Sequence, residues 1–123
     1  MKTILIIDDE KDFTFFVKAN LELTGRYKVI MAQNGKDGLR AAQQNKPALI
    51  LLDVMMPGMD GLEVLKRLKE SEKTMHIPVI ILTAKGDDDT KMLAATSFNE
   101  DFIVKPVELK LLASKVDSVL ARI

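Results

Sequence analysis

Five short apolar runs rich in β-branched residues recur along this chain of 123 residues, and segments with helical periodicity separate them. The runs are nearly continuous in hydrophobicity instead of alternating between apolar and polar residues. This pattern is typical of strands that are covered on both faces in a parallel sheet. The predicted strands span residues 3–7, 28–32, 48–52, 79–82 and 102–104.

The segments between these runs place apolar side chains at helical spacing. In the first segment, Phe13, Phe16, Val17 and Leu21 form an inward-facing stripe that ends at Gly25, a residue type that favours helix termini. Further helices are predicted over residues 35–44, 61–70, 89–96 and 107–123. The inward-facing residues predicted for the last helix are Leu111, Leu112, Val116, Val119 and Leu120.

Strands and helices that alternate in this way predict right-handed crossovers with helices on both faces of the sheet. The expected fold is therefore α/β, a doubly wound five-stranded parallel sheet. Five strand-helix units favour the flavodoxin-like order 2-1-3-4-5, in which ligands bind at the carboxyl ends of the first and third strands. The length fits one domain, expected to span residues 1–123.

The composition excludes several classes of function. Eighteen basic and eighteen acidic side chains cancel, so no global field attracts nucleic acid or anionic lipid. The absence of cysteine excludes disulfides, thiol catalysis and zinc sites of the CxxC type. The first apolar run is short and is followed by acids, unlike a signal peptide or a membrane span. We therefore expect a cytoplasmic protein with no membrane partner and no direct nucleic-acid partner.

Polar residues stand at the ends of four predicted strands. Asp8 and Asp9 follow the first strand, Asp53 the third, Thr83 the fourth and Lys105 the fifth. The first and third strands are neighbours in the proposed order, so three carboxylates would repel one another in one pocket. A hard divalent cation resolves this conflict, and Mg²⁺ suits carboxylate oxygens while leaving positions open for a phosphate. Lys105 would add a positive charge for a phosphoryl oxygen.

This set of side chains favours phosphoryl transfer to a carboxylate, in which the metal and the lysine neutralise charge on the transferred group. Asp53 is the predicted nucleophile because it ends a central apolar run and is flanked by acids that can hold the metal. Asp8 and Asp9 are the predicted ligands, and the Thr83 hydroxyl is expected to donate a hydrogen bond.

Four motifs, in this order along the chain, resemble those of the response-regulator receiver family. They are Asp8-Asp9-Glu10, the segment DVMMPGMDG at residues 53–61, Thr83-Ala84 and Lys105-Pro106. The resemblance extends from Lys2 to the last predicted helix. It implies a receiver domain with the same flavodoxin-like sheet order.

The resemblance implies a specific role for each acid. Asp53 would be the phosphoacceptor and also a ligand of Mg²⁺, the expected cofactor. The other metal ligands would be Asp8, Asp9 and the backbone carbonyl of Met55.

The resemblance also implies how the phosphoryl group would be sensed. Thr83, Ala84 and Lys105 would contact it, and a cis peptide would join Lys105 to Pro106. Thr83 and Phe102 would form the switch, with Phe102 at a position where the family often has tyrosine. Phe102 lacks the tyrosine hydroxyl, so only a ring that moves between two packings is expected to signal here.

A receiver of this kind would serve a two-component phosphorelay. Its donor would be a sensor histidine kinase or a phosphotransfer protein, and it would catalyse only its own phosphotransfer and dephosphorylation. Its output would be a downstream effector or a self-dimer, bound through the face of the fourth helix, the fifth strand and the fifth helix. The sequence leaves open whether it is a stand-alone regulator or part of a longer protein.

Three other functions are alternatives for a chain with this predicted fold. A phosphohydrolase that uses an aspartyl phosphate would need a second acid two residues after Asp53, where this chain has Met55. A flavin or nucleotide binder of the same sheet order would have a first loop rich in Ser, Thr and Gly instead of acids. A degenerate receiver would bind a partner without being phosphorylated, although all the expected site residues are present.

Overall fold

The computed structural model describes residues 1–56, 58–59, 61–84, 101–105 and 107–122, and a five-stranded parallel sheet forms its centre. The strand order is β2-β1-β3-β4-β5, which confirms the predicted sheet. Every predicted strand corresponds to an observed one, with small differences at the ends. The strands are β1 (Lys2–Ile7), β2 (Tyr27–Ala32), β3 (Leu49–Asp53), β4 (Val79–Ala84) and β5 (Asp101–Lys105).

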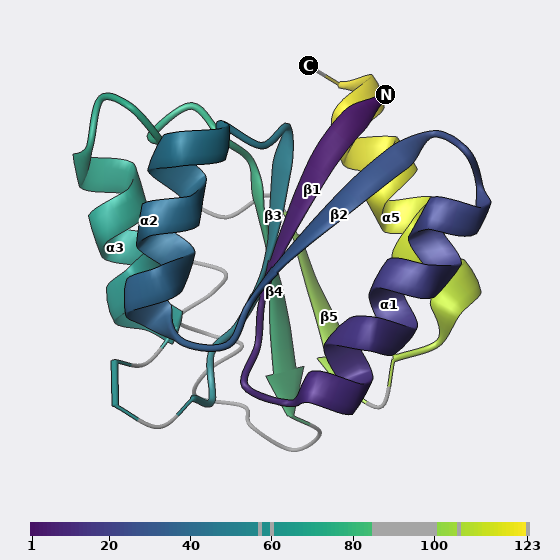
Figure 1. Ribbon diagram of the computed structural model, residues 1–123, viewed down its shortest axis with the longest axis horizontal. Coiled ribbons are helices and arrows are strands. Elements are labelled where there is room, and N and C mark those ends of the chain that lie inside the picture. The colour runs from purple at the N-terminus through teal and green to yellow at the C-terminus, as the bar shows by residue number, and fades with distance from the viewer. Residues whose placement is uncertain (57, 60, 85–100, 106, 123) are drawn as a thin grey trace.

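Helices cover both faces of the sheet, which confirms the doubly wound architecture (Figure 1). Those in the described residues are α1 (Lys11–Leu23), α2 (Gly35–Asn45), α3 (Gly61–Glu70) and α5 (Leu109–Ala121). The α1 and α5 helices lie on one face and α2 and α3 on the other. The helix predicted over residues 89–96 lies outside the described residues. In the part of the chain that the structure describes, no helix is long and apolar enough to cross a membrane.

The sheet separates two apolar cores, because consecutive residues of a strand point to opposite faces. In β1, Ile4 and Ile6 join the core under α1 and α5, whereas Leu5 and Ile7 join the core under α2 and α3. All four side chains are almost completely buried. Burial on both faces explains why this strand appears in the sequence as a continuous apolar run.

The strand register brings chemically active residues to one edge of the sheet. Ile7 pairs with Leu52, so Asp8, the residue after β1, lies beside Asp53, the last residue of β3. Lys105 ends β5, two strands farther across the sheet. The carboxyl ends of these strands lie at the lower edge in Figure 1, away from both chain termini.

The start of α3 is pressed against the end of β3. A Cβ atom on Gly61 would overlap the carbonyl oxygen of Asp53 and the Cα atom of Val54. The backbone N–H of Gly61 also donates a hydrogen bond to the Val54 carbonyl over 3.3 Å. Glycine is therefore required at this position by the close approach of the two backbones.

The face of α1 that meets the core differs from the prediction at Phe16. This side chain is 51% exposed, so its assignment to the inward stripe is wrong, whereas Val17 and Leu21 are buried as predicted. Thr14 is buried on the same face. Its hydroxyl donates a hydrogen bond to the Lys11 carbonyl over 2.9 Å, which satisfies the polar group inside the protein.

A similar correction applies to Leu111 in α5, which is 46% exposed although it is predicted to face inward. Successive helical residues are about 100° apart around the axis. In this helix that rotation leaves Leu112 buried against the sheet and turns Leu111 toward solvent. The remaining predicted residues, Leu112, Val116, Val119 and Leu120, are buried.

Two side chains of α1 hold the edge strand β2. The Lys18 ammonium donates a hydrogen bond to the Val29 carbonyl over 2.9 Å, and the Glu22 carboxylate accepts one from the Val29 N–H over 2.9 Å. Lys18 and Glu22 also form an ion pair at 2.9 Å. The outward peptide groups of Val29 are thereby satisfied on the side of β2 that has no neighbouring strand.

Candidate metal and phosphoryl-acceptor site

Two buried carboxylates lie side by side at the carboxyl edge of the sheet. Asp8 is 0% exposed and Asp53 is 3% exposed. Backbone groups fix both of them: the Glu10 N–H donates to Asp8 Oδ1 over 2.9 Å, and the Met55 N–H donates to Asp53 Oδ1 over 3.0 Å. Each carboxylate keeps its Oδ2 atom for other partners.

Lys105 reaches across from the end of β5 to meet these carboxylates. Its Nζ atom lies 2.8 Å from Asp8 Oδ2, 3.0 Å from Glu10 Oε1 and 3.7 Å from Asp53 Oδ2. It also lies 4.6 Å from the centre of the Phe13 ring, a distance at which a cation is attracted to an aromatic face. The lysine therefore bonds most directly to Asp8 and Glu10, and less directly to Asp53.

Burial raises the pKa of the Asp53 carboxyl to about 6, and the negative charges of Asp8 and Asp9 add to the rise, while the Met55 N–H and Lys105 oppose it. Burial alone would lower the pKa of Lys105. The hydrogen bonds to Asp8 and Glu10 outweigh burial, so the pKa of this lysine is raised. Counting the described residues alone, the site thus holds more negative charge than Lys105 offsets.

The donor set fits a hard divalent cation. Carboxylate oxygens of Asp8, Glu10 and Asp53 all lie within 4.8 Å of one another. Such oxygens are the ligands that Mg²⁺ prefers, and the ion completes its shell with waters or a phosphate. Asp9, a predicted ligand, is exposed, although its charge acts on Asp53.

Glu10 is the member of this site that the sequence reasoning did not single out. It is part of the motif Asp8-Asp9-Glu10, but the motif alone predicts no contact for it. The available signal is the alternation of side chains in an extended segment, where residues i and i+2 point the same way. Glu10 has an extended backbone, with φ −85° and ψ 101°, and so returns to the side of Asp8.

Three further predicted site residues, Thr83, Ala84 and Phe102, lie on β4 and β5. Thr83 and Ala84 are the last residues of β4, in register with Val104 and Lys105. Phe102 is partly buried and packs against the core under α2 and α3. The predicted cis peptide at Lys105-Pro106 involves Pro106, which lies outside the described residues.

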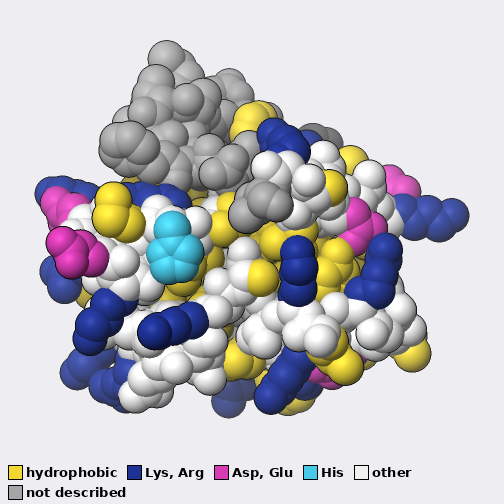
Figure 2. All heavy atoms as spheres, turned by 90° about the horizontal axis from the view of Figure 1, so that it is seen from above, with side chains coloured by type: hydrophobic (Ala, Val, Ile, Leu, Met, Phe, Trp, Pro, Cys, Tyr) yellow, Lys and Arg dark blue, Asp and Glu magenta, His cyan; other side chains and the backbone are white. Residues whose placement is uncertain are grey.

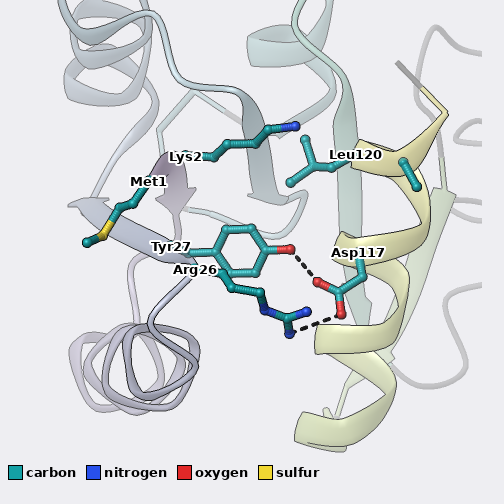
Figure 3. Close-up of a pocket in the computed structure, with 7 residues that line it drawn as sticks. Met1, Lys2, Arg26, Tyr27, Asp117 and Leu120 are labelled. Atoms are coloured by element: carbon teal, nitrogen blue, oxygen red, sulfur yellow. Dashed lines mark hydrogen bonds and ion pairs between the residues drawn. The ribbon is translucent and has the colours of Figure 1, made fainter.

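A separate cleft of about 410 Å³ opens at the other end of the molecule. Figure 3 shows Arg26, the residue before β2, and Tyr27, the first residue of β2, both reaching Asp117 on α5. Figure 2 looks onto this end, where basic side chains are spread among apolar ones. The cleft is lined by Met1, Lys2, Arg26, Tyr27, Asp117, Leu120 and Ala121. It shares no residue with the acidic site.

Comparison with known proteins finds close similarity. A family model described as the response regulator receiver domain matches residues 4–117. The phosphate regulon transcriptional regulatory protein PhoB of Pseudomonas aeruginosa is 40% identical over 121 residues, covering 98% of this chain and 52% of that protein. Protein PilH of the same organism is 36% identical over 121 residues, covering 98% of this chain and 99% of PilH.

A solved structure agrees with the fold. The receiver domain of the Francisella response regulator 1452 matches with a TM-score of 0.89 at 30% identity, covering 99% of this chain and 98% of that one. The chain spans about half the length of the first curated relatives that it matches.

Proposed function

Because this chain belongs to the response regulator receiver domain family, we propose that it is a phosphorelay switch that accepts a phosphoryl group on Asp53. The observation that carries the proposal is the buried Asp53 carboxylate, which has an oxygen within 4.8 Å of one of Asp8 and lies 3.7 Å from the Lys105 ammonium. The donor would be a phosphohistidine on a sensor histidine kinase or a phosphotransfer protein. The protein would turn over only its own phosphoryl group and no external substrate.

The transfer follows from the placement of these groups. Within the described residues, Asp53 Oδ2 accepts no backbone hydrogen bond, since the Met55 N–H donates to Oδ1. Oδ2 would attack phosphorus while the phosphorus–nitrogen bond of the donor breaks. The freed imidazole keeps the electron pair and takes up a proton, and an acyl phosphate forms on Asp53. Lys105 would neutralise an oxygen of the transferred group, and Thr83 and Ala84 would contact the others. In dephosphorylation, water attacks phosphorus and releases phosphate and the Asp53 carboxylate.

The metal ligands proposed for Mg²⁺ are Asp8, Asp9, Asp53 and the Met55 carbonyl. The ion would supply positive charge next to the phosphoryl oxygens. The buried pair of Asp8 and Asp53 supports this proposal, since two anions this close are stabilised by a cation. Asp53 ionises with a pKa near 6, so it is available as a nucleophile at neutral pH.

The output proposed for the switch is a change on the face that includes β5 and α5, together with the helix predicted over residues 89–96. Thr83 and Phe102 would move together and shift an equilibrium between two conformations. The ion pair between Lys115 and Asp101, at 2.9 Å, already joins α5 to β5 on this face. A downstream effector or a second copy of the chain would bind there, in the cytoplasm and without direct contact to nucleic acid or membrane.

Intact-mass spectrometry after incubation with acetyl phosphate tests the proposed function. We expect a single phosphoryl adduct that requires Mg²⁺ and is lost in Asp53→Asn. Asp117→Asn is the matched control, because Asp117 belongs to the cleft at the other end of the molecule. An adduct that persists in Asp53→Asn would refute Asp53 as the acceptor. The absence of both an adduct and Mg²⁺ binding would favour the degenerate receiver.

A further inference from the structure

The Lys105 ammonium lies closer to carboxylates of the segment that joins β1 to α1 than to the carboxylate of Asp53. Its Nζ atom is within hydrogen-bond distance of Asp8 and Glu10, at 2.8 and 3.0 Å, whereas Asp53 lies 3.7 Å away. The Phe13 ring covers the same ammonium group. Two of its three N–H donors are thus directed to carboxylates other than Asp53.

Of the two carboxylates that bind Lys105, that of Glu10 is the one that can move away from the lysine. Asp8 is fully buried and its second oxygen is fixed by a backbone N–H. The Glu10 side chain is 62% exposed. Glu10 is the N-cap residue of α1, but its side chain makes no capping hydrogen bond. Its carboxylate is therefore directed to Lys105 and not to the helix end.

We propose that Glu10 is a positioning residue that holds Lys105 away from Asp53 in the unphosphorylated protein and is displaced when a phosphoryl group occupies Asp53. The inference rests on the proposed function, because it concerns the regulation of the same site. A phosphoryl group on Asp53 adds roughly two negative charges next to Lys105 and close to the Glu10 carboxylate. The lysine then has a stronger partner, and like charges push Glu10 away.

Glu10→Gln removes the competing charge and keeps the size of the side chain. Asp12→Asn is the matched control, since Asp12 is an exposed acid in the first turn of the same helix. Beryllofluoride, an analogue of the phosphoryl group, is titrated at saturating Mg²⁺. We expect Glu10→Gln to bind it about two- to fivefold more tightly, as the loss of a partly exposed ion pair predicts. Asp12→Asn should stay within about twofold of the wild type.

A second readout needs no phosphoryl donor. The ¹⁵N-labelled ammonium group of Lys105, identified by its absence in Lys105→Arg, is observed by NMR. We expect a signal that is protected from exchange in the wild type and in Asp12→Asn, and that shifts or broadens in Glu10→Gln. This readout reports whether Glu10 holds the lysine.

Three results would contradict the role of Glu10 or the function on which it rests. Unchanged ammonium signal and unchanged beryllofluoride binding in Glu10→Gln would overturn the inference. A tenfold loss of Mg²⁺ affinity with weaker beryllofluoride binding would also overturn it, because Glu10 would then be a metal ligand. If the wild type binds no beryllofluoride and forms no adduct with acetyl phosphate, the proposed function fails, and with it the displacement step, whatever the ammonium signal shows.

Discussion

The phenolic hydroxyl of Tyr27 donates a hydrogen bond to the carboxylate of Asp117, which joins the start of the edge strand β2 to α5. The Arg26 guanidinium binds the same carboxylate at 3.2 Å. Figure 3 shows both side chains converging on Asp117. Tyr27 and Asp117 are 90 positions apart in the sequence. Their contact therefore joins the last helix to the first part of the chain.

The first prediction concerns the ionisation of Tyr27. Burial raises its pKa to about 12, and the hydrogen bond and charge of Asp117 add to the rise. A tyrosine in an unfolded chain ionises near about 10. The native protein therefore keeps a proton that the unfolded chain loses. This stabilisation is complete below about pH 10 and is lost by about 1.4 kcal/mol per pH unit as the pH rises toward 12.

Ultraviolet absorbance of the phenolate measures this directly, because the chain has one tyrosine and no tryptophan. We expect the midpoint near pH 12 or at the unfolding transition, whichever comes first, and a lower midpoint in Asp117→Asn. A midpoint near 10 in a protein that circular dichroism shows to be folded would contradict the prediction.

The second prediction concerns the contact between the start of α3 and the end of β3. We expect Gly61→Ala to lower the free energy of unfolding by about 2–3 kcal/mol, because the added methyl group meets backbone atoms that cannot move aside. Gly25→Ala is the control. Gly25 has a φ of +74° and open space around it, so strain alone should cost about 1 kcal/mol. Urea unfolding measures both values, and equal losses would argue against the close approach.

The third prediction concerns two aromatic residues on the surface of α1. Phe15 and Phe16 are 58% and 51% exposed, and they lie in the first turns of the helix that follows Glu10. An exposed aromatic pair on this helix is suited to binding a protein donor. We expect Phe16→Ala to slow phosphotransfer from a phosphohistidine domain by about tenfold. The reaction with acetyl phosphate should be unchanged.

Leu23→Ala provides the comparison for this experiment. Leu23 is 82% exposed at the far end of the same helix, so its truncation should leave both reactions unaltered. A slower reaction of Phe16→Ala with acetyl phosphate would mean that the substitution disturbs the site itself and does not report on docking.

The sheet could be predicted from the sequence because its strands are covered on both faces. That burial produces continuous apolar runs, and their alternation with helices limits the topology. The helix faces were harder to predict. Thr14 is buried because a local hydrogen bond satisfies its hydroxyl, and Phe16 is exposed although it is apolar. Neither outcome follows from hydrophobic periodicity.

The acids and the lysine of the candidate site were also predictable, since residues at the carboxyl ends of parallel strands share one edge. The alternation of side chains predicts the side on which Glu10 lies but not its contact with Lys105, which depends on how far the Lys105 side chain extends. That reach depends on the rotamers of a flexible chain of four methylene groups. A strand pattern predicts the position of the Cα atom of such a residue but not the position of its ammonium group.

The bonds from Lys18 and Glu22 to Val29 also bear on how copies of this chain can associate. An open edge strand is a template on which a second chain can add its own strand, a route to aggregation. A chain that approached β2 at Val29 would have to break both hydrogen bonds and the ion pair before it could pair there. The β2 edge is thus protected at Val29 from sheet extension by a second chain.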